Sequence, residues 1–127
     1  MPRSIGALAG HWRIVESDLW DQDALDLDGP ATLELKQDGT GQLTMIAIGA
    51  AVDGRFGQRD GRPSVEFSFQ GFDDGSPVSG RGWAALLPDG ALAGELFLHF
   101  GDESGFRAER AALPAPTRST RGPRRRR

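Results

Sequence analysis

Hydrophobic and polar residues alternate along much of the chain, in short runs that are separated by turn-forming residues. Val65, Phe67 and Phe69, for example, alternate with polar neighbours over residues 64–70. A period of two places alternate side chains on opposite faces of a β-strand. No segment has a clear helical period, although DQDALDLD (21–28) could hold one helical turn. The pattern predicts eight strands, at residues 10–19, 31–37, 41–48, 51–57, 63–70, 78–87, 91–100 and 105–112.

The turn signals between these runs are unusually frequent. The dipeptide Asp-Gly occurs six times, at 28–29, 38–39, 53–54, 60–61, 74–75 and 89–90. Asp-Gly suits the left-handed positions of tight hairpin turns, although the pair at 53–54 could instead form a bulge. We therefore predict an all-β antiparallel meander. It is most economically closed as a small barrel of seven or eight strands, because closure leaves no strand edge exposed. A β-sandwich is the alternative.

Two strands carry patterns with a structural consequence. Leu92, Leu96, Leu98 and Phe100 share one face of the strand 91–100, across Gly94, which predicts a core-facing row. In the first strand, two acids share the parity of the apolar residues, and a buried acid requires a partner. Either Arg110 or Arg81 supplies that partner, or a bulge turns the strand after Val15. The acids concerned are Glu16 and Asp18.

Length and charge divide the chain into a domain and two flanks. The 127 residues suit one domain, which we place at 10–112, after a lead-in at 1–9. Residues 113–127 are rich in proline and arginine, and we expect a disordered tail. The tail carries six arginines, whereas the rest of the chain holds 18 acidic and nine basic residues. An arginine tail can bind nucleic acid, but an acidic body without a basic stripe argues against that partner.

The composition argues against several other classes of protein. The longest weakly polar run, at 43–52, is too short to span a bilayer, and the first residues lack the apolar core of a secretory signal. We therefore expect a cytoplasmic protein without a membrane partner. The absence of cysteine excludes disulfides and thiolate metal sites. No motif predicts a cofactor.

The start of the first strand carries a weak family signal. Gly10-His11-Trp12 resembles the G-x-W with which the first strand opens in calycins, the superfamily of lipocalins, fatty-acid-binding proteins and avidins. The resemblance implies a basic residue from the last strand packed across the tryptophan, and Arg110 is in position to close the barrel over Trp12 by cation–π stacking. The lipocalin T-D-Y block is absent, and the chain has no tyrosine.

A more specific resemblance covers most of residues 10–110. The blocks LWDQDALDLDGPA (19–31), VEFSFQGFDDG (65–75), SGRGWA (79–84) and LHFGDESGFRAER (98–110) are similar to those of a family of small uncharacterised bacterial proteins. The resemblance implies a compact β domain. It implies no activity.

Acidic residues gather in the expected connections and offer one candidate site. In an eight-stranded meander the connections after strands one, three, five and seven emerge at the same end, which would form an acidic rim. Such a rim could serve an enzyme, although acids in turns are ordinarily explained by local backbone hydrogen bonds. No spacing predicts a metal site or a catalytic triad. The rim residues are Asp21, Asp23, Asp73, Asp74 and Asp102.

Our leading hypothesis is non-enzymatic binding of a small apolar or amphipathic ligand, inside the barrel or at its mouth. The rival is a protein-interaction or homodimerising module with a filled interior, whose interface would include Trp83 and Phe97. Both residues lie opposite the predicted core face of their strands. An enzyme at the acidic rim is the third possibility. Candidate ligand contacts are Trp20, Phe67, Phe69, Arg81, Trp83, Leu96 and Leu98.

Overall fold

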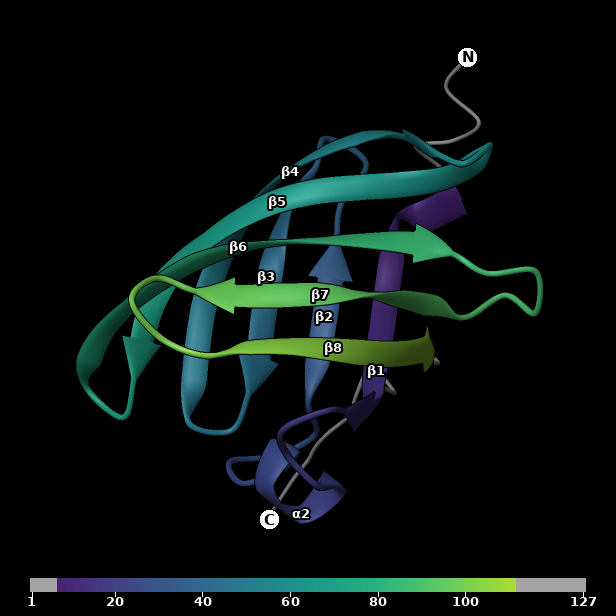
Figure 1. Cartoon of the computed structure of the whole chain (residues 1–127). Helices are drawn as coiled ribbons and strands as arrows, with labels where there is room; N and C mark the ends of the chain where they lie inside the picture. Colours follow the sequence, from purple (N-terminus) through teal and green to yellow (C-terminus); the bar gives the residue numbers. More distant parts are fainter. Residues whose placement is uncertain (1–6, 112–127) are drawn as a thin grey trace, which may run out of the picture.

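The chain folds as a closed barrel of eight antiparallel strands that follow one another in sequence order (Figure 1). A computed structural model describes residues 7–111. One helical turn, α2 (Gln22–Leu25), interrupts the meander between the first two strands. The strands are β1 (Gly10–Ser17), β2 (Thr32–Leu35), β3 (Thr40–Met45), β4 (Ile48–Arg59), β5 (Arg62–Asp73), β6 (Ser76–Leu86), β7 (Leu92–Leu98) and β8 (Glu103–Arg110).

The predicted all-β barrel is therefore confirmed, and it is compatible with a calycin-like fold. The helical turn anticipated in 21–28 is confirmed as α2, where the Asp21 carboxylate accepts a hydrogen bond from the backbone N–H of Ala24 at 2.9 Å. The bulge alternative in β1 is also confirmed, because its register against β8 shifts between Ile14 and Glu16. That bulge leaves Glu16 and Asp18 exposed instead of buried.

The predicted turn or bulge at Asp53-Gly54 and several of the predicted strand ends were wrong. Asp53-Gly54 forms neither a turn nor a bulge, since both residues pair regularly with β5. The chain turns at residues 46–47, because Met45 pairs with Ile48 and this register keeps both side chains inside. β7 ends at Leu98, and Phe100 leaves the core row: its φ is 60° and its side chain is 98% exposed.

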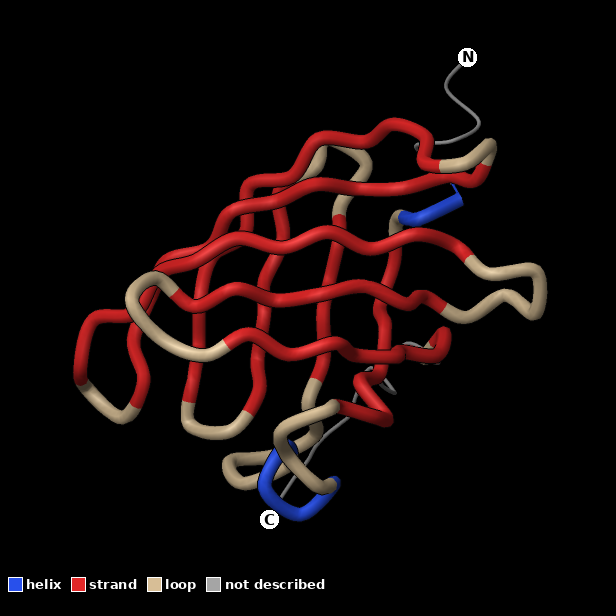
Figure 2. The backbone as a smooth tube through the Cα atoms, viewed as in Figure 1, coloured by secondary structure: helices blue, strands red, loops and turns tan. Residues whose placement is uncertain are grey.

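Asp-Gly forms the expected tight turn in two of the hairpins. Asp60-Gly61 and Asp74-Gly75 form two-residue turns in which all four φ angles are positive, as the type I′ turn requires. These turns join the longest strands, β4, β5 and β6, which have 12, 12 and 11 residues. Figure 2 shows these strands curving together around one side of the barrel, with their turns reaching outward.

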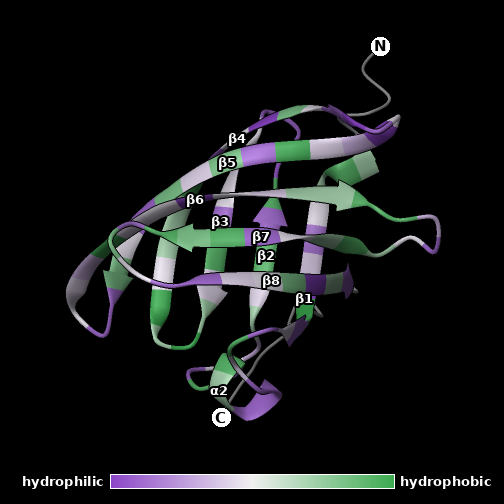
Figure 3. Ribbon diagram, viewed as in Figure 1, coloured by the Kyte–Doolittle hydropathy of each residue, from purple (hydrophilic) through white to green (hydrophobic). Residues whose placement is uncertain are grey.

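Side chains fill the interior of the barrel. Hydrophilic and hydrophobic bands alternate along β5 in Figure 3, and the hydrophobic residues Val65, Phe67 and Phe69 face inward. Phe67 lies opposite Gly82 on β6, and Phe69 lies opposite Gly80. A Cβ atom at Gly82 would lie 2.8 Å from Phe67 Cζ, and one at Gly80 would lie 2.6 Å from Phe69 Cζ. The glycines of SGRGWA therefore leave room for the two phenyl rings.

The segment that contains α2 covers one end of the barrel. Leu25 is buried, and its carbonyl oxygen accepts a hydrogen bond of 2.8 Å from the backbone N–H of Ile46 in the β3–β4 turn. Two hydrogen bonds, of 2.7 and 2.6 Å, join the Arg13 guanidinium to the Asp26 carboxylate and hold the segment in place. Trp20 is half-buried and packs against the core from this end.

Near the other end, Trp12 and Arg110 anchor the chain before β1. The indole N–H of Trp12 donates to the carbonyl of Leu8 at 3.0 Å. Arg110 Cζ lies 4.1 Å from the centre of the Trp12 ring, and its nitrogens donate to the carbonyls of Ala9 and Ala7 at 2.6 and 2.7 Å. The arrangement is a cation–π contact combined with hydrogen bonds.

Candidate functional site

The outer surface of β4–β7 carries a groove of adjoining hollows, which we call the outer groove. Its central part has a volume of about 820 Å³ and is lined by outward residues of four strands, including Asp53, Ser68, Arg81 and Phe97. Ser68 lies between Asp53 and Arg81 in the cross-strand register. Its side chain is shorter than theirs, so the surface is hollowed between these two residues. The floor of the groove is therefore a strand face, and its walls are long side chains.

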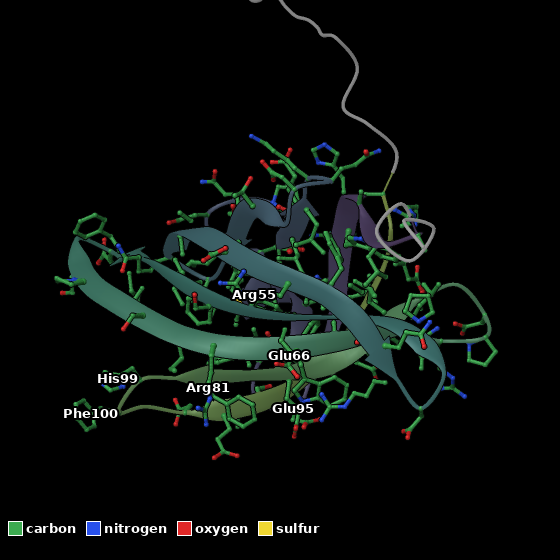
Figure 4. All side chains as sticks on the ribbon, turned by 90° about the horizontal axis from the view of Figure 1, so that it is seen from above. Arg55, Glu66, Arg81, Glu95, His99 and Phe100 are labelled. Carbon is green, nitrogen blue, oxygen red and sulfur yellow. The ribbon has the colours of Figure 1, made fainter. Side chains whose placement is uncertain are left out.

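One end of the outer groove, the arginine end, is lined by Arg55, Arg59, Arg81 and Trp83 together with the acids Asp53 and Glu66. Arg59 Cζ lies 3.8 Å from the centre of the Trp83 ring, and the indole N–H donates to Glu95 Oε1 at 3.2 Å. Arg81 Cζ lies 5.6 Å from the centre of the Phe97 ring. Figure 4 shows Arg55, Glu66, Arg81 and Glu95 on this side of the sheet.

The three arginines of this end have no ionic partner among residues 7–111. Within residues 7–111, Arg55, Arg59 and Arg81 form no salt bridge and donate no side-chain hydrogen bond. Arg55 nevertheless lies directly opposite Glu66 in the register. A guanidinium that stacks on an aromatic ring keeps its N–H edge available, and that edge matches a carboxylate or a phosphate. The arginine end can therefore recognise an anionic group.

The other end, the phenylalanine end, is richer in apolar side chains. It lies between the β5–β6 hairpin and the β7–β8 turn, and its lining combines Phe72, Pro77, Val78 and Phe100 with Gln70, Gly71, Ser79 and His99. Phe72 is 59% exposed, and Phe100 is the residue already described as 98% exposed. The Phe100 ring lies 4.1 Å from the His99 ring, centre to centre, and Figure 4 shows both at the edge of the face.

Of the ligand contacts that the sequence suggested, Trp20 lies at the end of the barrel that α2 covers, and the structure separates the other six into two groups. Phe67, Phe69 and Leu96 are buried inside the barrel, and Leu98 on the same face is half-buried. Arg81 and Trp83 lie on the outer surface, away from that interior. Arg81 forms no salt bridge with Glu66 or Glu95, which lie on the neighbouring strands. The parity of β6 explains the division, because Gly80 and Gly82 take the inward positions.

The acids of the predicted rim lie at one end of the meander but in separate places. Asp21 caps α2, Asp23 is exposed on the same helix, and Asp73, Asp74 and Asp102 are exposed in the hairpins. Figure 1 shows the β5–β6 hairpin well away from α2. No group of three His, Asp or Glu residues with metal-binding geometry occurs in the described part of the chain.

The strongest electrostatic interaction lies outside the outer groove. The hydrogen bonds from Arg13 hold the pKa of Asp26 well below its usual range, and the backbone N–H of Ala31 adds to the effect. A similar pair on the surface, Arg107 with Asp89 at 2.7 Å, lowers the pKa of Asp89. Both pairs are structural, because each joins a strand to a connecting segment.

Several residues of the outer groove were not among the predicted contacts. Arg55 and Arg59 are outward by the parity of β4. The possible turn or bulge at Asp53-Gly54 left the face of Arg55 open, and Arg59 lies beyond the predicted end of that strand at residue 57. Phe72 was missed because the predicted strand ended at residue 70, whereas β5 continues to Asp73. Phe100 was assigned to the core row, and only the turn after Leu98 reverses that assignment.

Comparisons with known proteins add no assignment to this geometry. No family model and no curated protein matches the chain. Between residues 7 and 111, no helix is long and apolar enough to cross a membrane.

Proposed function

We propose that the protein is a non-enzymatic interaction module that binds a partner protein on the outer groove. One observation carries the proposal: arginines that have no salt bridge among residues 7–111 lie together with partly exposed aromatic residues in a groove on a sheet face. Aromatic residues and arginine are enriched at protein interfaces, and tryptophan and arginine are the commonest hot spots.

The filled interior supports the same choice. Phe67 and Phe69 pack against the backbone of β6, and their ring centres lie 6.5 Å apart. A small apolar or amphipathic ligand inside the barrel would have to displace such side chains. Binding of that kind stays a prediction, and a bound mass of a few hundred daltons in native mass spectrometry of freshly purified protein would favour it.

Site-specific photocrosslinking in the producing cell tests the proposal. The substitution Phe97→p-benzoylphenylalanine places a photoreactive ring in the outer groove. The control Gln37→p-benzoylphenylalanine places the same group in the exposed β2–β3 turn. We expect discrete crosslinked products from position 97 that are absent from position 37. Equal labelling at the two positions, or none at position 97, would contradict docking on this face.

A further inference from the structure

The outer groove is long enough to hold an extended stretch of polypeptide. Its central part shares Arg81 and Phe97 with the arginine end, and it shares His99 and Phe100 with the phenylalanine end. Along β5 the lining runs from Glu66 to Phe72, which corresponds to about 20 Å at roughly 3.3 Å per residue. An extended peptide of about six residues has the same length.

The charge of the groove differs from that of the rest of the domain. Residues 1–112 hold twice as many acids as bases, yet the arginine end has three arginines against the two acids Asp53 and Glu66. The third nearby acid, Glu95, keeps its charge while it accepts the hydrogen bond of Trp83, so the arginine end is balanced in charge whereas the domain is acidic. An approaching anion is therefore repelled by most of the surface, and at this end it meets guanidinium groups that have no salt bridge among residues 7–111. These guanidinium groups favour an acidic partner.

The opposite end favours an apolar side chain. Phe100 occupies the left-handed region at φ 60° with almost no contact to the core. For a residue other than glycine this conformation costs about 1–3 kcal/mol, and such strain concentrates at binding sites. Phe72 and Pro77 face each other on the adjacent hairpin and complete an apolar surface.

We propose that the outer groove binds an extended acidic segment of a partner protein, with its carboxylates at the arginine end and an apolar side chain against Phe72 and Phe100. This inference rests on the proposed function, because it specifies the partner of the same groove. A second copy of the chain is the alternative occupant. We favour the acidic segment because two copies of this acidic domain repel each other on approach, whereas the segment complements the arginine end.

Selection from a display library of random peptides, each long enough to span the groove, tests the inference. The bait proteins are the full chain, the variant Arg55→Glu/Arg81→Glu and the control Lys36→Glu, which makes one charge reversal of the same sign in the β2–β3 turn. Circular dichroism and urea unfolding establish that each bait is folded. Sedimentation velocity of each bait measures self-association.

We expect the full chain and the Lys36→Glu control to enrich peptides that combine Asp or Glu at one end with Phe, Leu or Trp at the other. A synthetic peptide of the enriched sequence should bind Arg55→Glu/Arg81→Glu about tenfold more weakly or worse. That variant should instead prefer the same peptide with its acids replaced by lysine. The reversal of preference separates charge recognition from a general loss of structure.

The contrary outcomes distinguish the two proposals. Enrichment of basic or uncharged peptides that bind in the groove would overturn the acidic segment and leave the interaction module standing. Enriched peptides that bind the groove variant as well as the full chain would overturn the site itself. A full-chain dimer that Arg55→Glu/Arg81→Glu dissociates would assign the groove to a second copy and overturn the peptide.

Discussion

Arginines on two sides of the same barrel are used in opposite ways. On the side of β1 and β8, Arg13 pairs with Asp26, Arg107 pairs with Asp89, and Arg110 packs on Trp12 while it donates to two backbone carbonyls. On the side of β4–β6, Arg55 and Arg81 have no carboxylate within salt-bridge distance among residues 7–111. The first group fastens chain segments to the barrel, and the second group remains available.

The contrast teaches that binding capacity is recognised by what the fold leaves unpaired. A guanidinium that already has a bidentate partner gains little from a second anion, whereas a stacked and unpaired guanidinium still offers its hydrogen-bond donors. The same reasoning applies across the sheet itself. The inner face of β5 is fully packed, while its outer face holds the groove.

The largest expected effect is a difference in stability between substitutions on the inner and the outer face of the sheet. Phe67→Ala removes a buried ring and should lower the free energy of unfolding by about 3–5 kcal/mol. Trp83→Ser removes an aromatic ring from the outer face and should lower the free energy of unfolding by only about 1 kcal/mol. Urea unfolding of both variants measures the difference. A Trp83 variant that is as unstable as the Phe67 variant would make Trp83 a core residue and remove it from the candidate site.

A smaller loss of stability is expected where a glycine leaves room for a phenyl ring on the inner face. Gly82→Ala would place Cβ 2.6 Å from the carbonyl oxygen of Glu95 and 2.8 Å from Phe67 Cζ. Overpacking of this kind costs about 1–3 kcal/mol. Gly57→Ala in β4 is the matched control, because no atom lies within 4 Å of its added Cβ. Equal urea midpoints for the two variants would show that the interior near β6 can accommodate an added methyl group.

Alternation and turn chemistry made the fold predictable, whereas the site was only partly so. The inward parity of Phe67 and the Asp60-Gly61 turn follow from local rules that the structure obeys. Arg81 illustrates the limit, because parity places it outward but cannot say whether Glu66 or Glu95 pairs with it. That depends on side-chain conformations across three strands. Phe100 shows a second limit, since a single left-handed residue after Leu98 converts a predicted core position into an exposed one.

Acid should weaken the paired side of the molecule selectively. The pKa of Asp26 is lowered in the folded protein, so the folded state binds fewer protons than an unfolded chain whose aspartates titrate near pH 3.9. The Arg13 pair therefore contributes its full stability above about pH 5 and loses it as the pH falls further. The stability advantage of the wild type over Asp26→Asn, measured by urea unfolding, should be largest at pH 7 and shrink steadily toward pH 2.5.

The control for this titration is a second acid of α2. Asp23→Asn removes a carboxylate that makes no side-chain hydrogen bond within residues 7–111. It shows the effect of removing a carboxylate from α2 while the Arg13 pair stays intact. An Asp26→Asn difference that does not change between pH 7 and pH 2.5 would mean that the Arg13 pair does not stabilise the fold, and the contrast between the two sides would lose one of its supports.

The smallest expected change in stability lies in the β7–β8 turn and has the opposite sign. Phe100→Asn replaces an exposed ring in the left-handed region with a residue that tolerates that region. The free energy of unfolding should rise by up to about 1 kcal/mol, because backbone strain is relieved and no core contact is lost. Phe72→Asn is the matched control: it removes an exposed aromatic residue from regular β5, where the same change should lower stability.

Both variants should weaken peptide binding at the phenylalanine end. A Phe100→Asn variant that gains stability and keeps full binding would show that the strained phenylalanine serves no interface.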